Sequence, residues 1–205
     1  MICYTLGHSN LRWTLFMGLL RAQGITQLLD IRPCPDEGPP RFHRHHLAWM
    51  LPGGGIHYDW LGDALGGTFP DEALPAPLGL DRREAMHRQP AYLHGWRRLL
   101  QALRDTPGPA CLLGSAEDPL PCHRHWLIGQ DLADLGVEVL HIRKPRKGRT
   151  QVLKVLPTPP TLLPPLTERP TGKIPRFAPA PPPPETWTDP IRPTPHLRPL
   201  DSPKS

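Results

Sequence analysis

The chain has 205 residues, a length that favours one domain or two small ones. Its 31 prolines are unevenly placed, because 17 of them fall among the 49 residues from Pro157 to Ser205. A segment so rich in proline and poor in aliphatic residues cannot bury enough apolar surface to offset the entropy of ordering it. We therefore predict an α/β domain over residues 1–155 and a disordered Pro-rich tail over residues 156–205.

The formal net charge of +5 is concentrated in one short segment. Residues 1–142 carry 12 Lys+Arg against 15 Asp+Glu, whereas residues 143–154 carry six basic residues and no acidic one. Such a segment either holds phosphate groups electrostatically or serves as a solvated linker. Both interpretations stay open at this point.

The cysteine pattern and the hydropathy of the chain indicate a soluble protein of the cytoplasm. The four cysteines lack the paired spacing of zinc ribbons and thioredoxin motifs. No secretion signal is visible, and no run approaches the roughly 18 apolar residues of a membrane span. Free thiols are expected in that reducing compartment.

Taken in chain order, short apolar runs alternate with helical patterns. Asn10 is positioned to cap the first helix. A long polar loop precedes residue 80. This alternation predicts an α/β fold, with a five-stranded, mainly parallel sheet and helices on both faces. The predicted strands cover residues 2–6, 27–31, 56–60, 110–113 and 137–142, and the predicted helices cover residues 11–23, 43–50, 92–104 and about 122–136.

Polar residues collect just after the predicted strands, where open α/β sheets bind their ligands. Simpler structural roles exist for several of them, such as helix capping by Ser9 or Asn10 and an ion pair between Asp30 and Arg32. Together they indicate a binding site at one edge of the sheet. The candidates for catalysis are His8, Asp30, Glu117 and Cys122, and the candidates for holding a phosphate or other ligand are Ser9, Asn10, Arg32, His57, Ser115, His123 and Arg124.

Cys122 lies at the start of a predicted helix, beside His123 and Arg124. The helix dipole and these basic neighbours are expected to lower the pKa of the thiol, although a small buried apolar role is the simpler alternative. Rhodanese-like sulfurtransferases and cysteine phosphatases need an arginine five or six positions beyond the thiol, where this chain has Leu127 and Ile128. The sequence therefore favours phosphate binding over attack by the thiol.

Metal binding is the other interpretation that eleven histidines invite. His43 and His46 fall three positions apart on one predicted helix face, and Cys34 precedes them. No second Cys or His pair completes a tetrahedral set, so a solvated helix face is the preferred interpretation. We predict no metal and no cofactor.

A series of motifs follows the predicted elements in order. The motifs are Thr5-Leu6-Gly7-His8-Ser9-Asn10, Asp30-Ile31-Arg32 with Pro35, Phe42, Gly55-Ile56-His57-Tyr58, Leu61-Gly62, Leu65-Gly66-Gly67, and Cys122-His123-Arg124 after Asp118-Pro119. Together they resemble the bacterial and archaeal family called domain of unknown function 488. This resemblance implies an α/β fold with a shared polar pocket, in a family without a settled activity.

The chain departs from this family at the end of the fourth predicted strand, where the family usually has Cys-Ala-Glu. Gly114, Ser115 and Ala116 stand there, with Glu117 displaced by one. If that cysteine or glutamate is catalytic in the family, this protein either binds without turnover or uses Glu117 instead.

Three functional hypotheses follow. In the first, the protein is an enzyme or sensor acting on a nucleotide or a nucleic-acid end, with Arg32 and Arg124 holding phosphate while the acidic and imidazole groups move protons. In the second, it is a non-catalytic interaction module whose tail, around residues 180–184, docks on the aromatic groove of a protein partner. The third is thiol chemistry at Cys122. No membrane partner is expected.

Overall fold

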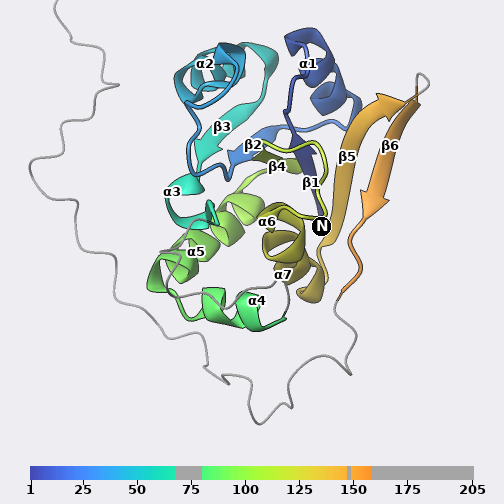
Figure 1. The fold of residues 1–205 in the computed structure, drawn as a ribbon. Helices are drawn as coiled ribbons and strands as arrows, with labels where there is room; N and C mark the ends of the chain where they lie inside the picture. The colour runs from blue at the N-terminus through green and yellow to red at the C-terminus, as the bar shows by residue number, and fades with distance from the viewer. Residues whose placement is uncertain (68–79, 147–148, 158–205) are drawn as a thin grey trace, which may run out of the picture. The chain divides into compact units, whose positions relative to one another are not determined.

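The computed structural model describes residues 1–67, 80–146 and 149–157. They contain a six-stranded sheet with the order β3-β2-β4-β1-β5-β6 (Figure 1). Five strands run parallel, and β6 pairs antiparallel with β5. The predicted α/β fold is confirmed, with one strand more than the sequence indicated. The strands are β1 (Ile2–Gly7), β2 (Gln27–Asp30), β3 (His57–Trp60), β4 (Ala110–Gly114), β5 (Glu138–Arg146) and β6 (Arg149–Lys154).

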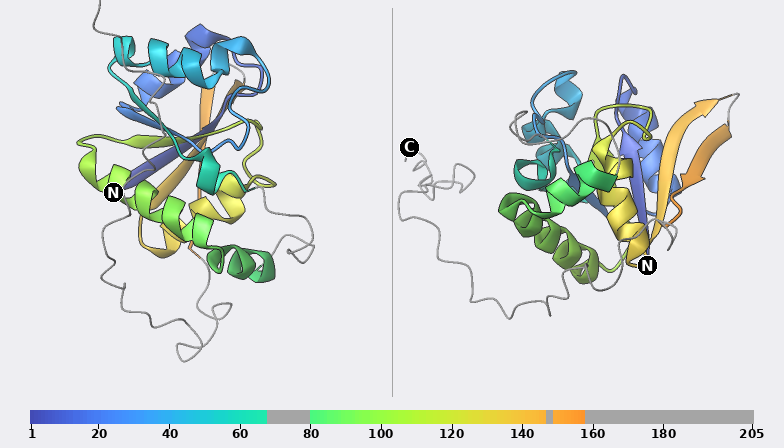
Figure 2. Two further views of the ribbon diagram at one scale, coloured as in Figure 1. Left: turned by 90° about the vertical axis from the view of Figure 1, so that its left-hand side faces the viewer. Right: turned by 60° about the horizontal axis from the view of Figure 1, so that its bottom comes forward.

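Helices cover both faces of this sheet (Figure 2). One face packs on α1 and α2 through a cluster that includes Phe16 and Leu47. The other packs on α5 and α7 through a cluster that includes Leu99 and Leu132. The helices are α1 (Trp13–Ala22), α2 (Arg44–Met50), α3 (Gly62–Leu65), α4 (Leu80–His87), α5 (Pro90–Asp105), α6 (His123–Trp126) and α7 (Ile128–Asp134), with short 3-10 turns η1 (Pro40–Phe42) and η2 (Pro52–Gly54).

The inner strands β2 and β4 are buried along their whole length. Their side chains alternate between the two clusters, so that Leu28 and Leu113 pack on one face while Leu29 and Leu112 pack on the other. This is the period-two alternation of a strand that is covered on both sides. It explains why these strands read as continuous apolar runs.

The predicted helix after residue 122 is broken in two. Leu127 leaves the helical region with φ −112° and ψ −81°, so α6 is a single turn and α7 follows it. The first helix also begins later than expected, at Trp13, with Arg12 at its N-cap and no side-chain cap. Asn10 is therefore not a capping residue.

The basic segment after residue 142 is not a linker. β5 continues through Arg146, and β6 returns beside it from Arg149 to Lys154. Every residue of β6 is exposed, so the segment shows no apolar alternation that would have predicted a strand. The helix α4 was likewise not predicted, because its sequence LDRREAMH has no apolar stripe.

Parts of two predicted segments lie outside the described residues. They are residues 68–79 of the long polar loop and residues 158–205 of the Pro-rich tail. Among the helices that are described, none has both the length and the apolar character needed to span a bilayer.

The strand register brings the carboxyl ends of four strands level with one another. Gly7 pairs with Gly114, and Asp30 pairs with both Leu113 and Trp60. The segments that follow these strands therefore emerge at one edge of the sheet, which is the edge where open parallel sheets bind ligands.

We predict that the close approach at Gly7 makes this position intolerant of a side chain. A Cβ atom there would overlap the carbonyl oxygen of Ala116 and lie 3.0 Å from Nη2 of Arg124. Gly7→Ala should lower the free energy of unfolding by about 3 kcal/mol, measured by urea denaturation. Gly18→Ala is the matched control, because a Cβ atom there meets nothing within 4 Å. In the middle of α1 it should stabilise by about 0.5–1 kcal/mol, and equal effects would contradict the prediction.

Candidate functional site

A buried ion pair between Asp30 and Arg32 lies at the end of β2. Nε and Nη2 of Arg32 donate to the two carboxylate oxygens at 2.8 and 2.6 Å, and the backbone N–H of Arg32 donates to Oδ1 at 3.0 Å. Tyr58 donates its hydroxyl to Oδ2 at 2.8 Å, and Arg32 also donates to the carbonyl of Phe42. Burial and the neighbouring carboxylate raise the pKa of Tyr58. Both oxygens of Asp30 are thus engaged, which suits positioning of Arg32 better than proton transfer.

His8 completes this network and is held in one tautomer. Its Nε2 lies 3.0 Å from Nη1 of Arg32, which can only donate, so Nε2 accepts and Nδ1 carries the hydrogen that is donated to the carbonyl of Ser9. Burial and the charge of Arg32 lower the pKa of His8 to about 4. The ring of His8 also stacks on the ring of Phe42, with 4.5 Å between the ring centroids. His8 is therefore a neutral, buried acceptor at pH 7.

Arg124 is a second buried arginine, and its charge is poorly compensated. Its Nη2 donates to the carbonyl of Glu117 at 2.8 Å, whereas Nε and Nη1 have no hydrogen-bond partner among the described residues. No carboxylate forms a salt bridge with Arg124 in that part of the chain. A buried guanidinium without an anion is costly. The thiol of Cys122 is the group with the largest favourable effect on the charged form of Arg124, and the charge of Asp118 adds a smaller one.

Cys122 is the N-cap residue of α6, and both His123 and Arg124 interact with its thiol. Its Sγ lies 3.7 Å from Nδ1 of His123, whose Nε2 lies 3.1 Å from the carbonyl oxygen of Ile31. Because a carbonyl only accepts, Nε2 carries a hydrogen, which leaves Nδ1 facing the sulfur. Burial alone would raise the pKa of the thiol, but the hydrogen bond and charge of His123, together with the charge of Arg124, bring it down from 9.0 to about 7.

Cys122 and His123 border a cavity of about 260 Å³. Gly67, with φ +71°, packs against His123, because a Cβ atom at this position would lie 2.9 Å from Cγ of the ring. A Cβ atom at Gly66 would lie 2.7 Å from Cβ of Pro33. The Gly-Gly pair therefore lets this segment approach the histidine closely. The cavity is lined by Arg32, Pro33, Gly66, Ser115, Ala116, Pro121, Cys122 and His123.

The structure brings together most of the residues that the sequence singled out, but with altered roles for three of them. Ser9, at φ 40°, donates its backbone N–H to the carbonyl of Ser115 at 2.8 Å, and Asn10 is exposed. Glu117 offers its carbonyl to Arg124, and its carboxylate is not among the groups that line the cavity. Ser9 and Glu117 thus make these contacts through backbone atoms and not through the side chains that the sequence singled out.

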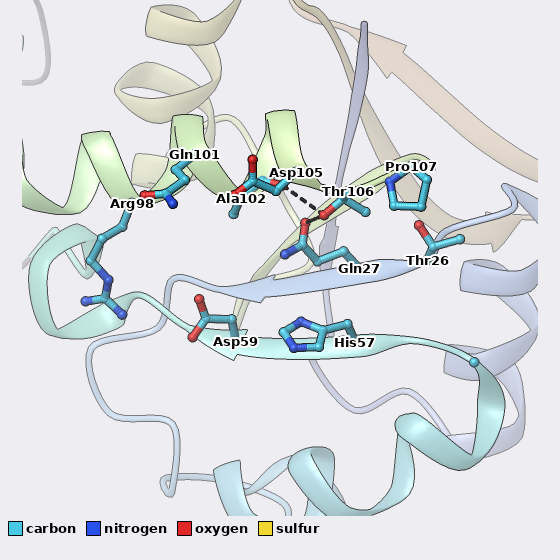
Figure 3. Close-up of a pocket in the computed structure, with 11 residues that line it drawn as sticks. Thr26, Gln27, His57, Asp59, Arg98, Gln101, Ala102, Asp105, Thr106 and Pro107 are labelled. Atoms are coloured by element: carbon cyan, nitrogen blue, oxygen red, sulfur yellow. Dashed lines mark hydrogen bonds between the residues drawn. The ribbon is translucent and has the colours of Figure 1, made fainter.

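His57 lies elsewhere, and the expectation that it follows a strand was wrong. It is the first residue of β3, so it sits at the amino end of the sheet, where it lines a second cavity of about 720 Å³ (Figure 3). That cavity also contains Gln27, which accepts a hydrogen bond from Thr106 at 2.5 Å, and Arg98, which pairs with Asp63. Although this cavity is larger, it lies at the other end of the strands from the cavity that Arg32, Cys122 and His123 line.

A possible metal-binding set differs from the one weighed in the sequence. Ligand atoms of Asp36, His43 and His45 lie within 4.8 Å of one another on the surface. His43 donates to the carbonyl of Gly38, and Asp36 accepts the backbone N–H that opens α2, so both already hold this loop together. His46, the expected partner of His43, instead packs edge-on against Trp13 at 5.4 Å.

The fold and this site define an α/β protein with a cysteine, supported by histidine and arginine, at the carboxyl edge of a mainly parallel sheet. Residues 12–130 match the family described as Domain of unknown function DUF488, and the chain belongs to that family. No curated protein and no solved structure matches it. Several of the motifs that carried the resemblance surround the small cavity, since Arg32, Gly66, Cys122 and His123 all line it.

The departure from the family pattern at residue 114 bears directly on Arg124. A Cβ atom at Gly114 would lie 2.8 Å from Nη1, which is one of the two nitrogens without a partner. Sequence reasoning missed this contact, and it missed the contacts that Tyr58 and Pro33 make at the site, because nothing in a linear pattern shows which side chains meet across the sheet edge. The glycine pair at 66–67 was the available sequence signal of a close backbone approach.

We predict that stability falls on acidification through the buried histidines. The pKa of His8 in the folded state, about 4, is below the usual 6.5, so its contribution is complete above pH 6.5 and is lost as the pH falls to about 4. The loss amounts to about 3 kcal/mol, at about 1.4 kcal/mol per unit of pKa. His141, with a pKa lowered by burial to about 3, adds to it.

Urea denaturation across this pH window measures the effect. His8→Asn should flatten the pH dependence, whereas His94→Asn should not, because His94 is exposed. An unchanged slope in His8→Asn would show that this histidine is not buried in its neutral form.

Proposed function

We propose that Cys122 is the reactive group of this protein and that the adjoining cavity admits a small electrophilic substrate. The observation that supports this most is the buried guanidinium of Arg124, which has two unpartnered nitrogens and lies beside the thiol. An enzyme that depends on a thiolate needs a positive group of this kind to stabilise the anion. Retaining an unpaired buried arginine is otherwise unfavourable.

His123 is the proton acceptor in this proposal. Its Nδ1 faces Sγ, and the carbonyl of Ile31 holds the opposite ring nitrogen, which is the arrangement of nucleophile, base and orienting group found in thiol enzymes. When Nδ1 takes the thiol proton, the resulting imidazolium and Arg124 both face the thiolate. Sulfur then bonds to the electrophilic atom of a substrate in the cavity, near the exposed Ser115 on its wall. The bond between that atom and its leaving group breaks, and the imidazolium of His123 returns the proton to the leaving group.

The arginine that matters is two residues beyond the thiol, not five or six. The spacing argument from sequence assumed that a phosphate-binding loop supplies the positive charge. Here a single helical turn folds the Arg124 side chain back beside Cys122. A reactive thiolate also suits the reducing cytoplasm, which is the location that we propose.

The chain contains its own reference thiols for a test. Burial raises the pKa of Cys3 and Cys111, and Glu37 raises the pKa of the exposed Cys34. Iodoacetamide should therefore label Cys122 in preference to Cys34 at pH 7, with a midpoint of the rate profile near 7. Peptide mass spectrometry assigns the labelled residues. Faster labelling of the exposed Cys34 would reject the proposal.

The variant Arg124→Met isolates the charge. We expect it to fold, because it replaces an uncompensated buried cation with an apolar chain of similar length. The midpoint for Cys122 should rise by at least about one unit. Arg104→Met is the control, since Arg104 is exposed on α5. The same shift in both variants would mean that Arg124 has no special role.

A second candidate function is the binding of a phosphate group of a nucleotide or nucleic-acid end. It is favoured by the presence of Arg32 on the cavity wall with Cys122, His123 and Ser115. Arg32 is balanced by Asp30, however, and Arg124 is covered, with a side chain only 1% exposed. The arginines therefore support the thiol more directly than they support a phosphate.

A nucleotide panel tests this candidate. Trp60 donates its indole N–H to the carbonyl of Arg32 at 2.9 Å, so its fluorescence should report occupation of the cavity. Ser115→Asp should weaken binding at least about tenfold by placing a negative charge on the wall. Gln101→Glu adds a comparable charge in the larger cavity and should have no effect. Equal loss in the two variants, or no binding at all, would exclude a phosphate site here.

The proposed protein partner of the Pro-rich tail stays a prediction, because residues 158–205 lie outside the described part of the chain. This hypothesis does not depend on the function proposed for the cavity beside Cys122.

A further inference from the structure

The strand pair β5–β6 at one edge of the sheet falls in the most basic segment of residues 1–154. Residues 143–154 hold six basic residues and no acidic one, against an excess of three acidic residues over positions 1–142. In the described part of this segment, residues 143–146 end β5 and residues 149–154 form β6, a two-stranded ribbon whose outer strand is exposed throughout. Five of the six basic residues therefore belong to the two strands.

The charges on this ribbon are only partly neutralised. Arg143 pairs with Asp118 at 3.2 Å, and Lys154 pairs with Glu138 at 2.8 Å. Lys144 and Arg149 are exposed, and neither forms a salt bridge with an acidic residue in the described part of the chain. The register also sets Arg149 opposite Arg146. A polyanion bound here would supply negative charge to Lys144 and Arg149.

The ribbon is linked to the cavity through the loop that follows β4. Asp118, the partner of Arg143, belongs to the same loop as Ser115 and Pro121, which line the cavity. Figure 1 shows β5 and β6 beside β1 at the edge of the sheet, running past the level at which β1 ends. A chain of phosphates lying on the ribbon would thus pass close to the loop that forms one wall of the cavity.

We propose that the β5–β6 ribbon binds the phosphate backbone of a nucleic acid. A two-stranded antiparallel ribbon fits a nucleic-acid groove, and a row of lysine and arginine side chains neutralises successive phosphates. The inference goes beyond the thiol chemistry proposed for Cys122 and does not depend on it. It adds a nucleic acid as a binding partner and does not alter the reaction proposed at Cys122.

Fluorescence anisotropy with a short fluorescein-labelled DNA duplex and the full-length protein tests the inference. Affinity should fall steeply between about 50 and 200 mM KCl, as counterion release requires. The double variant Lys144→Gln/Arg149→Gln should bind at least about tenfold more weakly at the lower salt concentration, and the slope of log K against log salt should decrease by about 2.

A charge-matched variant distinguishes the ribbon from general electrostatics. Arg88→Gln/Arg104→Gln removes the same charge from exposed positions outside the sheet and should bind as the wild type does. Equal loss in the two double variants would overturn the inference, and so would displacement of the duplex by polyglutamate at equal charge concentration. Cys122→Ser should retain binding, so that failure of the thiol proposal and failure of this one are separately visible.

Discussion

The guanidinium of Arg124 lies against the carboxyl ends of β1 and β4, in space that Gly7 and Gly114 leave open. It is 1% exposed, and among the described residues its side chain has one hydrogen bond, to the carbonyl of Glu117. Taking a cation out of water costs free energy unless an anion accompanies it. The thiol of Cys122 and the carboxylate of Asp118 both favour the charged form of Arg124, but no carboxylate of the described residues forms a salt bridge with it. In the function that we propose, Arg124 and the thiolate of Cys122 each stabilise the charged form of the other.

The second arginine of the edge has the opposite character. Arg32 is fully engaged, with Asp30 on one side and His8 and Phe42 on others, so it is a structural cation. It fixes the segment after β2, whose Ile31 carbonyl in turn orients His123. In the function that we propose, the two arginines have different roles: Arg32 supports the geometry of the sheet edge, and Arg124 supports the charge of the thiolate. This division accounts for both arginines being buried in a small domain.

Much of the fold could be predicted from sequence, because buried parallel strands such as β2 and β4 read as short apolar runs between helical patterns. The exposed strand β6 could not, since neither face of it packs on the core. The rule for open sheets predicts a site at the carboxyl edge, which stays a prediction, and the roles of the residues there could not be predicted from the sequence. Whether Arg32 or Arg124 has free hydrogen-bond donors depends on contacts between residues far apart in the chain, which no spacing reveals. The family motifs gave the membership in DUF488 and the position of the glycines, but the reason for those glycines became clear only from their contacts with Pro33 and His123.

In the function that we propose, about half of Cys122 is thiolate at pH 7, because His123 and Arg124 lower the pKa of its thiol to about 7. The most direct measurement is the ultraviolet absorbance of the thiolate, titrated with pH in the wild-type protein and in Cys122→Ser. The difference between the two curves should rise with a midpoint of about 7. A difference curve that rises only near 9, as for an ordinary cysteine, would contradict the account.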